Sequence, residues 1–332
     1  MLLDIIYLAL SLIFILFACM TFANAVEWLG KKLNLSQGVV GSILAAVGTA
    51  LPETIIPIIA ILFSTGEQAH EIGIGAIAGA PFMLGTLAFF VTGAAVFIYT
   101  LLGKRTFKMN TDMSIFSRDL TFFIVVYGIA IATTFVNQYS TLKSIIAVAL
   151  CLSYVYYVLR TLKDKSENVD HLDPLFISKF LKVKNTLGTV MLQMLLALAG
   201  IVLGAHLFVH YVELFSGVLG ISPLILSIII TPIATELPEK LNSIIWIGKK
   251  KDTLALGNIT GAMVFQSCIP VAFGIAFTPW ALDGVTMISA ILAFTSAILN
   301  LLWIKVRRTV NPFALMFGGL LYLIFIYYAF FV

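Results

Sequence analysis

Charged residues are scarce in this sequence. Asp, Glu, Lys and Arg make up 11% of the 332 residues, whereas hydrophobic residues make up 61%. Soluble domains contain about 25% charged residues, so the composition excludes an ordinary soluble globular protein. No globular core could bury this much apolar surface. We therefore expect the lipid bilayer to be the main surrounding of the chain.

Cysteine is also scarce. Cys19, Cys151 and Cys268 lie far apart within apolar stretches. They lack the short spacings of a metal site or a disulfide framework, and we predict three inert helix residues. The net charge of +4 comes from basic residues scattered over short loops. This pattern argues against nucleic acid as a partner.

Long hydrophobic runs fill most of the chain. A helix needs about 20 apolar residues to cross the hydrocarbon core, and ten segments are of about this length. They are residues 2–28, 37–64, 73–102, 119–136, 142–160, 186–212, 222–247, 253–278, 284–304 and 311–331. The predicted fold class is an all-α integral membrane protein with ten transmembrane helices.

The basic residues alternate from one connection to the next. Eighteen of the twenty lie in the connections after the odd-numbered segments. They are Lys31, Lys32, Lys104, Arg105, Lys108, Arg118, Arg160, Lys163, Lys165, Lys179, Lys182, Lys184, Lys249, Lys250, Lys251, Lys305, Arg307 and Arg308. The positive-inside rule places these connections in the cytoplasm and both termini outside the cell. Short loops and the lack of a targeting extension favour the plasma membrane of a prokaryote.

The two halves of the chain resemble each other. Four matches are separated by 186 positions: Glu27 with Glu213, Ser36 with Ser222, Thr49 with Thr235, and Leu51-Pro52-Glu53 with Leu237-Pro238-Glu239. Residues 75–79 parallel residues 257–261 in the next segment. Five helix steps separate the paired segments, so the second copy runs in the opposite sense. We predict two inverted five-helix repeats, 1–160 and 186–332, joined by a cytoplasmic linker, 161–185.

The repeated motif places oxygen ligands near the membrane centre. Pro52 and Pro238 each remove a backbone donor and free the carbonyl four residues earlier. Thr49 and Glu53 share one helix face because they are four residues apart, and the second copy repeats this spacing. Freed carbonyls, hydroxyls and carboxylates are hard ligands of the kind that Ca²⁺ takes in sets of six to eight. Simple packing kinks with lysine-paired glutamates are the alternative, but two copies at one offset argue against it.

These motifs resemble the alpha-repeats of the calcium/cation antiporter (CaCA) superfamily, which includes the sodium/calcium exchangers. The family's G-T-S-L-P-E pattern is similar to residues 48–53 and 234–239, and its G-N-x-x-G-S-N pattern to residues 257–263. The resemblance implies a metal site that holds transported ions. Its residues would be Glu53, Glu239, Thr49, Thr235, Glu236, Asn258 and Gln266, with the backbone oxygens of Ala46 and Pro232.

Several positions depart from the family pattern. Ala76, Ala80 and Leu84 stand where the first copy would supply side-chain oxygens, and Glu236 replaces a serine in the second copy. The exchangers draw neutral oxygens for Na⁺ from both halves, so these losses favour H⁺ as a competing coupling ion. Lys240 follows Glu239, and we expect it to reach the cytoplasmic surface rather than serve as an internal counter-ion.

The function predicted from these features is secondary antiport of a divalent cation, Ca²⁺ first, for Na⁺ or H⁺ by alternating access. The protein would be no enzyme and hold no resident cofactor. Its partners would be the bilayer and the cations, and the oligomeric state stays open, with a monomer as one candidate. Open alternatives are a proton-coupled or non-calcium exchanger, an acidic-filter cation channel, an intramembrane carboxylate protease and a member that has lost transport. The mixed-charge linker 161–185 is expected to be solvated rather than a regulatory ion site.

Overall fold

The computed structural model describes residues 2–50, 53–54, 57–58, 61–62, 67–163, 172–219, 236–282 and 284–331. Within these ranges every regular element is helical, which confirms the all-α class. The first half contains α1 (Leu2–Lys32), α2 (Gln37–Val39), η1 (Val40–Ala45), α3 (Ala46–Thr49), α5 (Glu67–Met83), η2 (Leu84–Ala88), α6 (Phe89–Leu101), α7 (Met113–Thr133), η3 (Thr134–Val136) and α8 (Ser140–Thr161). The rest contains α9 (Phe176–Leu181), α10 (Leu187–Leu219), α13 (Leu237–Gly248), α14 (Asp252–Phe277), α15 (Gly284–Arg307) and α16 (Pro312–Phe331).

Eight helices of the described part are long and apolar enough to cross a membrane. They cover Ala9–Lys32, Gly73–Leu101, Met113–Val136, Ser140–Thr161, Leu187–Gly204, Asp252–Phe277, Gly284–Arg307 and Pro312–Ala329. The chain is thus a multi-pass membrane protein. The two predicted segments without a long span, 37–64 and 222–247, are those with the Leu-Pro-Glu motifs. Their described parts include the short helix Gln37–Thr49 and α13, so ten helices in two inverted repeats stays a prediction.

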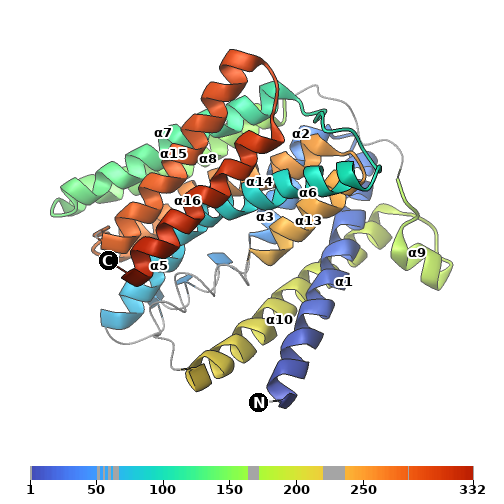
Figure 1. The fold of residues 1–332 in the computed structure, drawn as a ribbon, viewed down its shortest axis with the longest axis horizontal. Helices are drawn as coiled ribbons and strands as arrows, with labels where there is room; N and C mark the ends of the chain where they lie inside the picture. Colours follow the sequence, from blue (N-terminus) through green and yellow to red (C-terminus); the bar gives the residue numbers. More distant parts are fainter. Residues whose placement is uncertain are drawn as a thin grey trace.

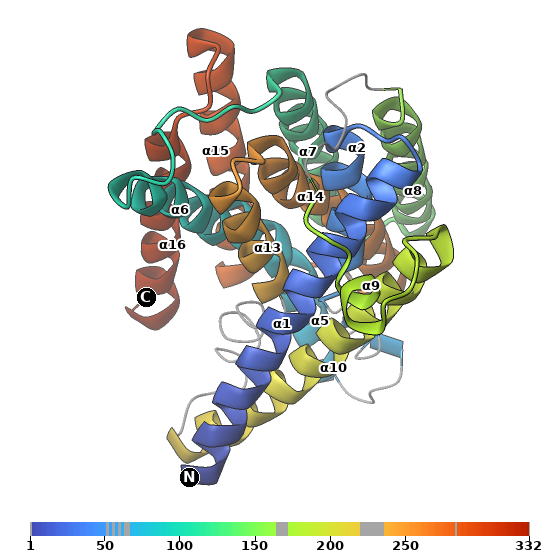
Figure 2. The same ribbon diagram turned by 90° about the vertical axis from the view of Figure 1, so that its right-hand side faces the viewer.

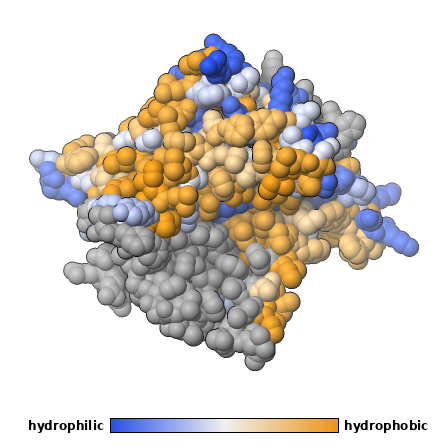
Figure 3. Space-filling model, viewed as in Figure 1, coloured by the Kyte–Doolittle hydropathy of each residue, from blue (hydrophilic) through white to orange (hydrophobic). Residues whose placement is uncertain are grey.

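Two long helices form a pair at one side of the molecule. α1 and α10 lie side by side, and their far ends project away from the other helices (Figures 1 and 2). Their approach is close at Gly204, where an added Cβ would lie 2.7 Å from the Ile15 side chain. Much of the coloured surface in Figure 3 is hydrophobic, with hydrophilic patches near its edges. This is the distribution that a bilayer requires.

α14 is the central helix of the remaining bundle, with 83% of its spanning window buried. It packs against η1 and α3 from the second predicted segment, α5 and η2 from the third, and α13 from the seventh. At Gly261 an added Cβ would lie 2.3 Å from the Ser42 carbonyl oxygen. The backbones of η1 and α14 therefore touch, which only glycine permits. η1 is a π-helix, a form that often occurs at functional sites.

Two basic residues of the connections between helices form ion pairs with buried carboxylates. Arg105 donates to both oxygens of Asp252, at 2.7 and 2.8 Å, with both side chains buried. Glu27 is only 1% exposed and accepts hydrogen bonds from Trp246 and Lys251. Since each buried carboxylate is paired with a cation, neither leaves an uncompensated charge.

The described part of the linker packs on α1. Trp28 Nε1 donates to the Asp173 carbonyl at 2.9 Å, and Asn24 Oδ1 accepts from the Phe176 amide at 3.2 Å. Lys249 donates to the Asp173 carboxylate, and this hydrogen bond holds the pKa of Asp173 below its usual value. Asp173, Pro174 and residues 179–181 are exposed, so this part of the linker is solvated on one side while its other side contacts α1. The acidic positions 164, 167 and 170 and His171 lie outside the described residues.

Candidate ion-binding site

α14 carries two amides toward the other half of the chain. The Asn258 Oδ1 accepts a hydrogen bond from Thr49 Oγ1 at 3.3 Å, and its Nδ2 donates to the Glu239 carbonyl at 3.3 Å. Two turns further on, Gln266 Nε2 donates to Glu53 Oε1 at 2.8 Å. Thr49, Asn258 and Gln266 have no exposed surface. Residues about 210 positions apart are thus joined at one interior place.

The first half contributes Thr49 and Glu53 to this place. Thr49 Oγ1 also lies 3.0 Å from the Ala45 carbonyl oxygen and 3.5 Å from the Ala46 carbonyl oxygen, which are alternative acceptors for its single proton. The Ala46 oxygen already accepts the Ala50 amide at 3.1 Å, so it is part of the helix as well as a predicted ligand. Glu53 is 6% exposed, and its Oε2 has no hydrogen-bond partner. The Thr49 hydroxyl and the Glu53 carboxylate thus both form hydrogen bonds with residues of α14.

The second half contributes two carboxylates at the start of α13. Glu236 is the residue before the helix, and Glu239 lies in its first turn, where the positive end of the helix dipole favours a carboxylate. Pro238 sits in the first turn, where proline removes no intrahelical hydrogen bond. The motif therefore marks the beginning of a helix. The predicted positions Thr235 and Pro232 lie outside the described residues.

Lys240 is the main difference from the sequence-based expectation. Its side chain is buried, at 4% exposure, and its Nζ donates to Glu236 Oε2 at 2.9 Å. The expectation that Lys240 reaches the cytoplasmic surface is wrong. A buried carboxylate four residues away holds the ammonium inside instead.

Five side-chain oxygens around these helices are buried without a partner. They are Glu53 Oε2, Glu236 Oε1, Glu239 Oε1, Glu239 Oε2 and Gln266 Oε1. Buried carboxylates normally accept several hydrogen bonds or contact a cation. The three carboxylates and Lys240 also interact electrostatically around Glu53. These are the groups that a desolvated cation could satisfy.

No three His, Cys, Asp or Glu side chains among the described residues lie close enough together to hold one ion. A cation here would therefore need neutral oxygens as well as carboxylates, as the amides of Asn258 and Gln266 and the Thr49 hydroxyl would provide. Asp119 is a useful contrast. This buried carboxylate accepts from Ser42 and Thr260 at 2.8 Å and from Arg118 at 2.7 Å, so it is fully paired.

Sequence reasoning missed Asn242. It has no exposed surface, and neither of its amide atoms has a partner. It lies three residues after Glu239 and so shares that side of α13, a spacing that could have drawn attention to it. The first-half positions Ala76, Ala80 and Leu84 are aliphatic and supply no polar side chain.

Comparisons with known proteins agree with this architecture. The chain is 24% identical over 298 residues to an uncharacterized membrane protein of Methanocaldococcus jannaschii, covering 89% of this chain and 88% of that one. It is 22% identical over 284 residues to the inner membrane protein YrbG of Escherichia coli K12, covering 85% and 82%. The structure of the sodium-calcium exchanger NCX_Mj soaked with 10 mM Na⁺ and zero Ca²⁺ superposes with a TM-score of 0.75 at 20% identity, over 100% of this chain and 99% of that one.

The match to a described family covers nearly the whole chain. Residues 3–163 and 189–332 fit the family described as sodium/calcium exchanger protein. The likeness to NCX_Mj supports the same fold. Members of this family are transporters and not enzymes. The chain therefore belongs to the sodium/calcium exchanger family.

Proposed function

We propose that the protein exchanges a divalent cation, with Ca²⁺ as the first candidate, for Na⁺ or H⁺. The observation that carries this proposal is the set of buried, unpartnered oxygens on Glu53, Glu236, Glu239 and Gln266. Ca²⁺ is bound by oxygen ligands at about 2.3–2.6 Å. Carboxylate and amide oxygens with no protein partner suit such an ion better than they suit an empty apolar interior.

The ligands would come from both halves of the chain. Glu53 and Thr49 stand on one side, and Glu239, Asn258 and Gln266 on the other, and two hydrogen bonds, Thr49 to Asn258 and Gln266 to Glu53, link the sides. A cation between them would draw the halves together. The same carboxylates would serve both ions in turn, so that one ion leaves as the other binds.

The packing of the helices supports a mechanism of alternating access. α3, α5, α13 and α14 form the bundle that surrounds the site, whereas α1 and α10 pair with each other along their length. In our proposal this pair slides past the bundle and opens the site to one side of the membrane and then the other. The chain would lie in the plasma membrane with both termini outside, because the basic connections would face the cytoplasm.

The coupling ion can be tested with purified protein in liposomes. Uptake of radioactive Ca²⁺ would be driven by an outward Na⁺ gradient in one set and an outward H⁺ gradient in another. Uptake with either gradient, and none without, is expected. Sodium-driven uptake would make Na⁺ the partner, and proton-driven uptake alone would make it H⁺. Ca²⁺ flux that needs no counter-ion, or no flux with either gradient, would refute Ca²⁺ exchange.

A further inference from the structure

A second site lies on the outer side of the bundle, away from the glutamates. A pocket of about 750 Å³ opens between α7, α8 and the end of α15. This volume is within the range of about 300–1,000 Å³ that is usual for ligand sites. Four of its lining residues are basic: Arg118, Arg160, Lys305 and Arg308. None of the residues that line it is acidic.

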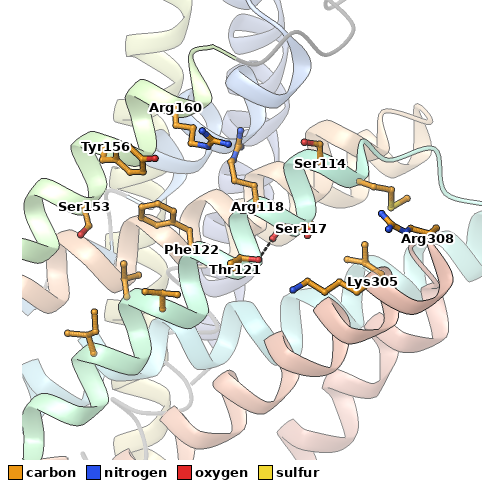
Figure 4. Close-up of a pocket in the computed structure, with 15 residues that line it drawn as sticks. Ser114, Ser117, Arg118, Thr121, Phe122, Ser153, Tyr156, Arg160, Lys305 and Arg308 are labelled. Carbon is orange, nitrogen blue, oxygen red and sulfur yellow. Dashed lines mark hydrogen bonds between the residues drawn. The ribbon is translucent and has the colours of Figure 1, made fainter.

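The basic groups that line this pocket come from α7, α8 and the end of α15. Figure 4 shows Arg118 on α7 and Arg160 on α8 turned toward the same part of the pocket, with Lys305 and Arg308 from the end of α15 beyond α7. Arg118 is fixed by Asp119 at 2.7 Å and lies 5.4 Å from the Tyr157 ring centre. The charge of Arg118 is therefore balanced by Asp119, whereas Arg160, Lys305 and Arg308 add positive charge with no acid among the lining residues, which favours an anion.

The remainder of the pocket is apolar or carries hydroxyls. Phe122, Val125, Val126, Ile129 and Tyr156 line its apolar part. Val125 and Tyr156 are each 57% exposed, as expected for side chains that face lipid tails. Ser114, Ser117, Thr121 and Ser153 also line it and are hydrogen-bonding groups suited to a phosphate or glycerol head. Apolar surface thus continues directly from a cationic rim.

We propose that this pocket binds an anionic phospholipid. The phosphate would lie among the four basic side chains, and an acyl chain would lie along Phe122, Val125 and Ile129. Basic pockets between transmembrane helices at the cytoplasmic side are suited to such head groups. The apolar part argues for a lipid over a free phosphate ion, because a free ion would not use it.

The test is native mass spectrometry of the full chain with added lipids. The wild type is expected to retain one phosphatidylglycerol at a concentration where at least tenfold less phosphatidylcholine is retained. Inorganic phosphate at millimolar concentration should not displace it. The triple variant Arg160→Gln/Lys305→Gln/Arg308→Gln should lose this preference, because these exposed residues supply three of the four charges. The control Lys31→Gln/Lys32→Gln removes two exposed charges at the end of α1 and should keep it.

A second variant tests the apolar part. Val125→Trp leaves every charge in place and fills the pocket from a half-exposed position, so it should also reduce phosphatidylglycerol retention severalfold. Equal retention by the wild type and both variants would overturn the proposal. So would equal retention of the two lipids, or displacement by phosphate, which would indicate a free-anion site.

Lys240 supports an independent inference, which rests on the proposed function. Three carboxylates, Glu53, Glu236 and Glu239, share the interior with this one ammonium. With all four groups charged, the net charge is −2, equal and opposite to one divalent cation. We infer that Lys240 is a built-in cation that sets the charge of the transport site.

The geometry supports this role over that of a simple structural pair. The Lys240 Nζ contacts Glu236 Oε2, while Glu236 Oε1 and both Glu239 oxygens have no partner. Lys240 thus neutralises the charge of one carboxylate, and the two remaining negative charges are available to the transported cation. A fixed ammonium also does in part what a second bound monovalent ion would do, which fits the lack of side-chain oxygens at Ala76 and Ala80.

Charge replacement tests the inference by equilibrium binding of radioactive Ca²⁺ to purified protein. Glu236→Gln leaves Lys240 without its partner and should weaken Ca²⁺ binding at least tenfold. Glu236→Gln/Lys240→Met returns the site to −2 and should recover affinity to within about threefold of the wild type. Both substitutions keep side-chain volume. Lys250→Met, which removes an exposed charge just after α13, should have no effect.

The outcomes separate this inference from the proposed function. If the wild type binds no divalent ion, the proposed function fails and this inference with it. If the wild type binds Ca²⁺ but the double variant stays as weak as Glu236→Gln, the charge role of Lys240 is wrong and the exchange proposal stands. Unchanged binding by Glu236→Gln would also overturn the charge role.

Discussion

The two halves of the chain contribute unequally to the interior site. The first half supplies Thr49 and Glu53 and only aliphatic residues at Ala76, Ala80 and Leu84. The second half supplies Glu236 just before α13, Glu239 and Lys240 in its first turn, and the amides Asn258 and Gln266 on α14. The second half of the chain thus carries most of the charges and amides of the candidate site, and the first half carries one carboxylate, Glu53.

The largest effect is expected from removing the charge of one of the two motif glutamates, of which each half of the chain supplies one. Glu53→Gln and Glu239→Gln keep the side-chain volume but each removes a charge from a buried site. Each should reduce Ca²⁺ transport in liposomes more than 100-fold, because divalent binding inside a protein depends on carboxylates. Asp173→Asn is the matched control, since this exposed linker acid lies outside the site. Robust transport by either glutamine variant would refute the assignment of the two glutamates.

The contact between the halves should be sensitive to a single added methyl group. Gly261→Ala would place a Cβ 2.3 Å from the Ser42 carbonyl oxygen. Because both groups are backbone, the strain should cost about 1–3 kcal/mol of stability. Thermal unfolding in detergent should show a lower midpoint. Gly188→Ala is the control, because only the Thr186 hydroxyl lies near, at 3.8 Å. An unchanged midpoint for Gly261→Ala would mean that η1 and α14 do not pack as closely as described.

The amide of the second half should matter less than the carboxylates. Gln266 donates to Glu53 Oε1 at 2.8 Å and has its own Oε1 unpartnered. Gln266→Leu removes both groups and should weaken Ca²⁺ binding about tenfold, in line with a hydrogen bond to a charged group of about 1.5–3 kcal/mol. Gln266→Glu tests the alternative. If the amide serves only to join helices, the acidic variant should bind Ca²⁺ as weakly as the leucine variant.

Oxygens can also be returned to the first half. Ala80→Ser places a hydroxyl where the family resemblance expects one. If the loss of such groups weakens Na⁺ binding, this variant should lower the Na⁺ concentration for half-maximal exchange about threefold, which corresponds to ~0.6 kcal/mol. Leu241→Ser, a hydroxyl on α13, is the comparison variant. If both variants lower the Na⁺ concentration for half-maximal exchange equally, the position of the added hydroxyl does not matter and the prediction is wrong.

The sequence was sufficient for some parts of this structure and insufficient for others. Composition and hydrophobic runs predict the all-α membrane class and eight of the ten segments as long helices, because span length is a local property. The L-P-E motifs predict Glu53 and Glu239 as buried acids. The position of the Lys240 side chain could not be predicted from the sequence. It contacts Glu236 instead of the surface because α13 begins directly after Glu236. The contact of the linker with α1 depends on hydrogen bonds such as that from Trp28 to the Asp173 carbonyl, which no local pattern encodes.

The smallest effect is expected outside the membrane, where the linker meets the second half. The Lys249 ammonium donates to Asp173 and lowers the pKa of that carboxyl in the folded protein. A lowered folded pKa means stability that is present above the unfolded pKa of about 3.9 and lost as the pH falls through the folded pKa. Both side chains are more than a third exposed, at 37% and 57%, so solvent limits the effect to about 0.5 kcal/mol or less. Asp173→Asn should therefore shift the thermal midpoint slightly at pH 7 and by less at pH 3. An equal shift at both pH values would show that Asp173 acts through packing and not through its charge.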